Sequence, residues 1–125
     1  MSKGREGDII WSGVDPTGRM VHELKSVNDA RVGKHTGPDS ISRDEVHACI
    51  ETPSFIDRSV QNDMRYNYYR KNPQPGKPPM DRVTVSFGDS ILAPDGVVIS
   101  CSKYSKPVKG VRVYMREADD EDAET

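Results

Sequence analysis

The spacing of apolar residues after Pro53 limits the fold of this chain more than any other feature of its sequence. In residues 82–88, Val83, Val85 and Phe87 alternate with polar side chains. A period of two is typical of a strand that turns one face to the core and the other to solvent. Further strands are predicted at residues 54–60, 65–71, 97–102 and 111–115. The C-terminal half is therefore predicted to be a meander of four or five antiparallel strands, with a proline-rich loop at residues 72–80.

The N-terminal part is predicted to begin with a β-hairpin over residues 8–24. Its turn is Asp15-Pro16-Thr17-Gly18, a run of residue types that favour turns. A short helix is expected to follow from Ser26, a residue type that caps helix N-termini, to about His35. Gly37-Pro38 stops this helix, because glycine and proline commonly follow helix C-termini.

A second helix is predicted by a stronger local pattern. Ser42 and Glu45 have the spacing of a capping box, in which each side chain satisfies a free amide at the helix start. Val46, Cys49 and Ile50 then give an apolar stripe at helical spacing. Together the elements predict an α+β fold, with an N-terminal β-hairpin and two short helices packed on a four- to five-stranded antiparallel sheet.

The length and the charge distribution divide the chain into three parts. Its 125 residues are enough for one domain, which we place at residues 8–116 between a flexible N-terminus (1–7) and an acidic disordered tail (117–125). The formal net charge is −2, but six of the 20 acidic residues lie in the last nine positions. The rest carries 18 basic against 14 acidic residues, a net charge of +4. A basic body permits a nucleic-acid partner. The tail is either a solubilising end or a mimic of phosphate charge that covers a basic groove.

Several functional classes find no support in the sequence. Apolar runs are too short for a transmembrane helix, and the polar N-terminus lacks the apolar segment of a signal peptide. We therefore expect no membrane partner and a cytoplasmic protein, in which Cys49 and Cys101 are buried thiols. The start at Met1 and the charged end favour a complete chain. Because phosphate-binding glycine motifs and zinc-like His/Cys spacings are absent from the sequence, we expect no cofactor and no metal.

The remaining polar residues are of the types that metal-free RNA cleavage needs, which are proton carriers, cations and hydroxyl donors. His35 is the candidate acid or base because histidine titrates near neutral pH, although an ordinary helix-end histidine would fit the same position. Arg65, Tyr69 and Lys71 share one strand face, which is either a phosphate-binding surface or a solvated edge.

Hydroxyl groups are concentrated near the end of the strand that begins at residue 97. Ser100, Ser102 and Tyr104 share a face if that strand extends far enough, and they are candidate donors to a phosphate. Small hydroxyl residues are also common on exposed strands. Tyr66 and Tyr68 lie on the other face of the 65–71 strand and are expected to pack in the core or at its rim.

The order of these features resembles the phage and polymorphic-toxin members of the barnase–EndoU–colicin–RelE nuclease superfamily. The resemblance covers about residues 8–115. Its motifs are the turn Asp15-Pro16-Thr17-Gly18-Arg19, the helix end Lys34-His35, the capped helix from Ile41 leading to Ile50-Glu51-Thr52-Pro53-Ser54-Phe55-Ile56, the tyrosine strand from Arg65, the valine strand Val83-Thr84-Val85, the hydroxyl strand Val97-Val98-Ile99-Ser100, and Lys109-Gly110-Val111. The resemblance implies metal-independent endoribonuclease chemistry, with His35 and Ser100 at matching positions and Arg65 at a basic one.

The sequence thus predicts a nuclease-like domain of bacterial toxin or phage origin that cleaves RNA by His-assisted transphosphorylation. The expected catalytic residues are His35 as acid or base, Arg65 as phosphate stabiliser, and Ser100 and Ser102 as donors. The expected partner is RNA, with tRNA as one candidate. The expected RNA-binding residues are Tyr69, Lys71, Lys103 and Tyr104. An antitoxin or immunity protein is the expected protein partner. The alternative is a catalytically inactive member that acts as a protein-binding or inhibitory module, since Asn28-Asp29-Ala30 stands where the family often has another histidine.

Overall fold

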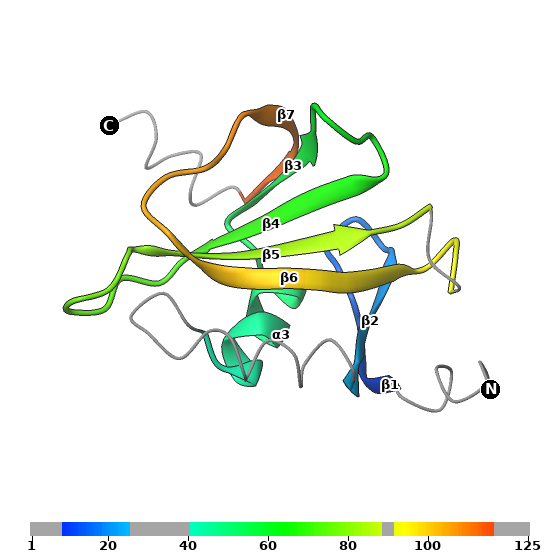
Figure 1. The fold of residues 1–125 in the computed structure, drawn as a ribbon, viewed down its shortest axis with the longest axis horizontal. Coiled ribbons are helices and arrows are strands. Elements are labelled where there is room, and N and C mark those ends of the chain that lie inside the picture. Colours follow the sequence, from blue (N-terminus) through cyan, green and yellow to red (C-terminus); the bar gives the residue numbers. More distant parts are fainter. Residues whose placement is uncertain (1–8, 26–40, 89–91, 117–125) are drawn as a thin grey trace.

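The strands of the protein form one mixed sheet (Figure 1). The computed structural model describes residues 9–25, 41–88 and 92–116. The elements within these ranges are β1 (Ile9–Val14), β2 (Met20–Leu24), α3 (Arg43–Glu51), β3 (Phe55–Ser59), β4 (Arg65–Lys71), β5 (Met80–Ser86), β6 (Gly96–Tyr104) and β7 (Gly110–Met115). The spatial order of the strands is β1-β2-β6-β5-β4-β3-β7, and α3 packs on one face of the sheet.

The four central strands form the antiparallel meander that the sequence predicts. β3 pairs with β4, β4 with β5, and β5 with β6, all in antiparallel register. Two further strands extend this meander at its edges. β2 pairs with β6 in parallel, through Val21 with Gly96 and His22 with Val97, and β7 pairs antiparallel with β3. Residues 105–109 therefore cross from the end of β6 to the far side of the meander. We call this segment the crossing loop.

The predicted sheet of four to five antiparallel strands with two helices is wrong. The sheet has seven strands and is mixed, and the residues that the structure describes contain one helix. The helix predicted over residues 26–35 lies outside the described residues. The physical cause of the error is that a period of two identifies strands but not their partners. An open sheet edge leaves a row of unpaired amides and carbonyls. β2 covers the edge of β6, and β7 covers the edge of β3.

Helix α3 begins where the sequence predicts, because both hydrogen bonds of the capping box form. The amide of Glu45 donates to the Ser42 hydroxyl at 3.1 Å, and the amide of Ser42 donates to the Glu45 carboxylate at 2.9 Å. Such a cap contributes about 1 kcal/mol to helix stability. In the parts of the chain that the structure describes, no helix is long and apolar enough to cross a membrane.

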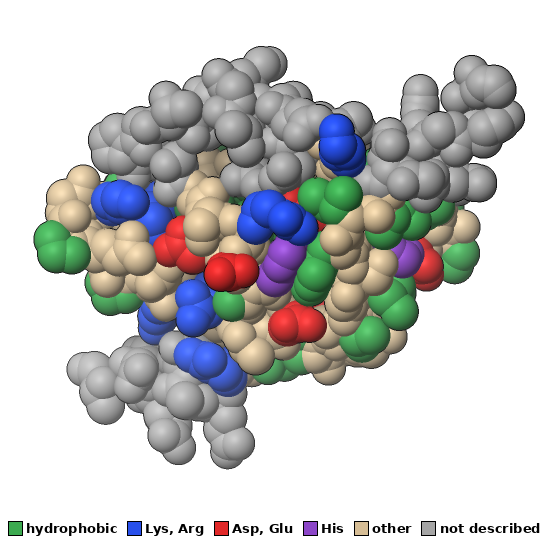
Figure 2. Space-filling model, turned by 90° about the horizontal axis from the view of Figure 1, so that it is seen from below, with side chains coloured by type: hydrophobic (Ala, Val, Ile, Leu, Met, Phe, Trp, Pro, Cys, Tyr) green, Lys and Arg blue, Asp and Glu red, His purple; other side chains and the backbone are tan. Residues whose placement is uncertain are grey.

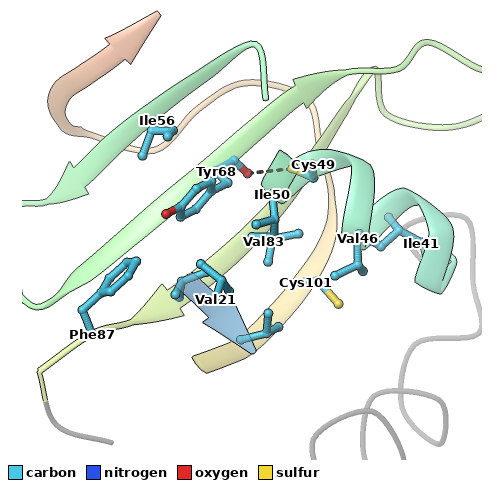
Figure 3. Packing of buried hydrophobic residues seen from close by; sticks show 12 residues of the cluster. Val21, Ile41, Val46, Cys49, Ile50, Ile56, Tyr68, Val83, Phe87 and Cys101 are labelled. Carbon is cyan, nitrogen blue, oxygen red and sulfur yellow. Dashed lines mark hydrogen bonds between the residues drawn. The ribbon is translucent and has the colours of Figure 1, made fainter. Parts of the chain in front are cut away.

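The main hydrophobic core lies between α3 and the sheet (Figure 3). The helix contributes its predicted stripe. β5 contributes Val83 and Val85, and Phe87 follows directly after its end. Tyr68 is fully buried in this cluster and Tyr66 packs at its rim, as predicted. The buried members are Val21, Ile41, Val46, Cys49, Ile50, Ile56, Tyr68, Val83, Val85, Phe87, Val98 and Cys101.

The turn of the β1–β2 hairpin is closed by the buried carboxylate of Asp15. One carboxylate oxygen accepts the backbone amides of Thr17, at 2.8 Å, and Arg19, at 3.0 Å. Gly18 between them has a φ of +93°, a conformation that glycine adopts without steric cost. The other oxygen accepts the hydroxyl of Tyr68 on β4. Burial, and then the bond to Asp15, raises the pKa of Tyr68 well above its usual value, so this hydroxyl stays protonated as the donor.

The two cysteines should be unreactive in the folded protein. Cys49 and Cys101 are buried thiols, as predicted, and the Cys49 thiol donates to the Tyr68 carbonyl at 3.1 Å (Figure 3). Burial raises the pKa of Cys49, which removes the reactive thiolate. We expect Ellman's reagent at pH 8 to modify no thiol in the native protein and both thiols in guanidinium chloride. Rapid modification of either cysteine under native conditions would contradict this packing.

Candidate functional site

A row of polar side chains crosses the middle of the sheet on the face opposite α3. Asn67 on β4 pairs with Thr84 on β5, which pairs with Ser100 on β6. Their neighbours along each strand, such as Val83 and Cys101, point into the core beneath the helix. Because side chains alternate along a strand, the polar row faces the other way. The Thr84 hydroxyl donates to the Asn67 side-chain oxygen at 2.6 Å, which ties two strands of the row together.

This row forms part of a pocket of about 470 Å³. One wall comes from the end of β3 and the residues after it, and another from the crossing loop. The crossing loop connects β6 to β7 across the meander, and it thereby supplies the pocket wall with Val108 and Lys109. The lining residues are Ser59, Val60, Gln61, Arg65, Asn67, Arg82, Thr84, Ile99, Ser100, Val108 and Lys109.

The pocket is lined by cations and hydrogen-bond donors. Arg65, Arg82 and Lys109 supply positive charge, and none of the described lining residues is acidic. The oxygen of Asn67, a lining residue, already accepts from Thr84, and the nitrogen of the same amide carries two N–H donors. The helix-bearing face differs, because Figure 2 shows basic and acidic side chains interspersed there. The pocket is therefore suited to an anion.

Arg82 has an unusual partner for an arginine of this protein. Its Nη2 donates to the Tyr104 hydroxyl at 2.5 Å, and its guanidinium carbon lies 3.8 Å from the centre of the Tyr104 ring. Its Nε is buried and has no hydrogen-bond partner among the described residues. The guanidinium is thus held by a tyrosine and not by a carboxylate of the described residues.

The structure brings two of the four predicted catalytic residues into this pocket. Arg65 and Ser100 both line it, from β4 and β6. Ser102 lies one row further along, where its backbone partner is Arg82, and it does not line the pocket. His35 lies outside the described residues.

The predicted RNA-binding residues lie in different places. Tyr69 is fully buried, and its hydroxyl accepts the amide of Val108 at 3.0 Å, which fixes the crossing loop. Burial raises the pKa of Tyr69, so the hydroxyl stays neutral. Lys71 is exposed at the end of β4 and is not part of the pocket lining. Tyr104 holds Arg82.

Lys103 points to the opposite face of the sheet from the pocket. Its side chain is buried, and its ammonium donates to the buried carboxylate of Asp81 on β5. The Glu45 carboxylate of α3 lies 3.7 Å away. Burial by itself would raise the pKa of Glu45, but hydrogen bonds from Ser42 and Asn72 and the charge of Lys103 lower it. Lys103 therefore joins the helix to the sheet.

Arg82, Thr84, Asn67 and Lys109 are among the pocket residues that sequence reasoning did not assign to a site. The period of two in residues 82–88 already places Arg82 and Thr84 on the face away from the core. What the pattern lacks is the register, which sets Thr84 beside Asn67 and Ser100. No local sequence pattern predicts that Lys109 lines the pocket, because its position depends on where the crossing loop ends.

The two described histidines lie outside the pocket and support the fold. His22 shares a hydrogen bond with the Ser12 hydroxyl at 2.6 Å and lies 2.9 Å from the Asp95 carboxylate, so it joins β1 and β2 to the residue before β6. His47 of α3 stacks on Trp11 with ring centres 4.0 Å apart and contacts the buried Glu23 at 2.7 Å. Among the described residues, no group of three or more His, Cys, Asp or Glu side chains is arranged to hold a metal ion.

Comparisons with known proteins found no match for this chain among protein-family models, curated proteins or solved structures. Membership of a family is thus not shown. The resemblance to the barnase–EndoU–colicin–RelE superfamily remains a prediction from the order of the sequence motifs. What the pocket itself establishes is a group of cations and donors on one sheet face.

Replacement of Lys103 should affect stability more than ligand binding. The Lys103→Met variant would leave the Asp81 carboxylate buried without its cation, which costs about 3–5 kcal/mol in typical proteins. Lys109→Met is the matched control, because Lys109 is exposed and lines the pocket. We expect urea unfolding to show a large loss of stability for Lys103→Met and a change within about 0.5 kcal/mol for Lys109→Met. Equal stability of the two variants would contradict the structural role of Lys103.

Proposed function

We propose that the protein is a metal-independent endoribonuclease whose pocket binds an RNA phosphodiester. The observation that carries the proposal is the gathering of Arg65, Arg82 and Lys109 with neutral donors in one pocket that has no described acidic lining residue. A phosphodiester carries one negative charge and two free oxygens that accept hydrogen bonds. Arginine suits such a group because its planar fork matches the two oxygens. The resemblance to a nuclease superfamily supports cleavage, and the pocket supports binding.

Cleavage by transphosphorylation makes three chemical demands. The RNA 2′-hydroxyl loses a proton and attacks the phosphorus, the leaving 5′-oxygen gains a proton, and the transition state carries extra negative charge on the phosphate oxygens. We assign the charge stabilisation to Arg65, Arg82 and Lys109. Ser100 adds a hydroxyl donor. His35 is assigned to proton transfer on the sequence prediction alone.

The pocket also has features that suit the rest of a nucleotide. Val60, Ile99 and Val108 add apolar surface among its polar lining residues. A ribose or a base packs favourably on such a surface, while the phosphate requires the cations. The proposal includes a cytoplasmic protein of toxin or phage origin, and an antitoxin or immunity protein that covers the pocket.

The test is cleavage of tRNA and of bulk RNA in the presence of EDTA. Wild-type protein should cleave both. Loss of one charge-stabilising donor costs about 10²–10³-fold in rate, so we expect this loss for Arg82→Ala. Loss of an acid or base costs about 10²–10⁴-fold, so we expect at least this loss for His35→Ala. Lys77→Ala is the matched control, because Lys77 is an exposed cation of the 72–79 loop, outside the pocket lining.

The outcomes separate the two functional classes. Circular dichroism and thermal melting must show that each variant is folded. Wild-type cleavage that survives in Arg82→Ala would show that this pocket is not the site. No cleavage by wild-type protein, with RNA binding that is equal in all the variants, would favour the protein-binding or inhibitory module instead.

A further inference from the structure

Arg82 differs from four other described arginines in how it is paired. Arg19, Arg43, Arg70 and Arg112 each lie within 4.0 Å of a carboxylate. A carboxylate partner orients an arginine but also neutralises its charge. Arg82 has no carboxylate within that distance among the described residues. Its partners are tyrosines: the Tyr104 side chain, and the hydroxyl of Tyr69, its register neighbour on β4.

Tyr104 makes two contacts with Arg82, and they act in different ways. The hydroxyl accepts from Nη2 and fixes the rotation of the guanidinium. The guanidinium carbon also lies over the ring, 3.8 Å from its centre, where the electron-rich ring face favours the cation. Neither contact removes the positive charge. Tyr104 is not part of the pocket lining, whereas Arg82 is.

The register of β5 and β6 places Tyr104 close to Arg82. The register pairs Arg82 with Ser102 and Met80 with Tyr104. Tyr104 is therefore the diagonal neighbour of Arg82 on the adjacent strand, a separation that long and aromatic side chains span. A free arginine side chain has many rotamers, and ordering it on ligand binding costs free energy. Fixing it before binding avoids that cost.

We propose that Tyr104 is a positioning residue, which holds the Arg82 guanidinium in place for a phosphodiester without contacting the RNA. The inference rests on the proposed function of the pocket. It assigns Tyr104 a role other than the direct RNA contact predicted from the sequence. Because Tyr104 acts through Arg82, its effect must vanish when Arg82 is absent.

A double-mutant cycle tests this dependence. The variants are Arg82→Ala, Tyr104→Phe, Tyr104→Leu and the combinations of each tyrosine variant with Arg82→Ala. The ligand is a 2′-O-methyl RNA oligonucleotide, which cannot be cleaved through the blocked 2′-hydroxyl, and its Kd is measured by fluorescence anisotropy at several salt concentrations. Tyr104→Phe keeps the ring and loses the hydroxyl, so it separates the two contacts and preserves packing.

We expect Arg82→Ala to raise Kd about 10-fold or more, since hydrogen bonds to charged groups are among the strongest in proteins. It should also lower the slope of log Kd against log salt by about one. Tyr104→Leu should raise Kd several-fold, and Tyr104→Phe should raise it less. In the Arg82→Ala background, neither tyrosine substitution should change Kd further.

Equal effects of the tyrosine substitutions with and without Arg82 would overturn the positioning role and indicate direct contact with RNA. No effect of Tyr104→Leu on wild-type affinity would overturn it too. A different result would overturn the proposed function of the pocket. In that case Arg65→Ala, Arg82→Ala and Lys109→Ala would all bind RNA with the Kd of the wild type. Thermal melting of the Phe and Leu variants shows whether a loss of affinity comes from unfolding.

Discussion

The bond between the Tyr68 hydroxyl and the Asp15 carboxylate joins the N-terminal hairpin to the central strands, and the shape of the core depends on it. Asp15 also closes the turn, through the amides of Thr17 and Arg19. Arg19 in turn covers the rings of Tyr66 and Phe87. A buried carboxylate is costly unless its oxygens are hydrogen-bonded. The Asp15 carboxylate therefore joins the turn to β4, because it takes its hydrogen-bond donors from both.

The two faces of the central strands differ in how their charged side chains are paired. On the helix side, cations are matched by acids, as in the pair of Lys103 with Asp81. On the pocket side, Arg65, Arg82 and Lys109 line a site without a described acidic residue. This separation comes from the alternation of side chains, since successive residues of β6 reach opposite faces. Cations on the helix side are paired within the fold, whereas cations on the other side line the pocket.

The aromatic residues near the pocket act mainly through other residues. Tyr69 fixes the crossing loop through Val108, and Tyr104 fixes Arg82. Both tyrosines contribute a hydroxyl, which hydrogen-bonds a neighbouring group and fixes its position. A carboxylate in the same place would instead offset the positive charge of the pocket.

The sequence by itself determined the local elements and the core. The capping box set the start of α3, and the period of two set β4 and β5 and turned Val83 and Val85 inward, because these signals depend on neighbours in the chain. Arg65 and Ser100 could be singled out in the same way. Only the tertiary structure decided that β2 and β7 join the sheet, that Arg82 and Lys109 line the pocket, and that Lys103 is buried on the other face. The physical reason is that strand pairing and register arise between residues distant in sequence, and a one-residue shift in register would exchange the two faces.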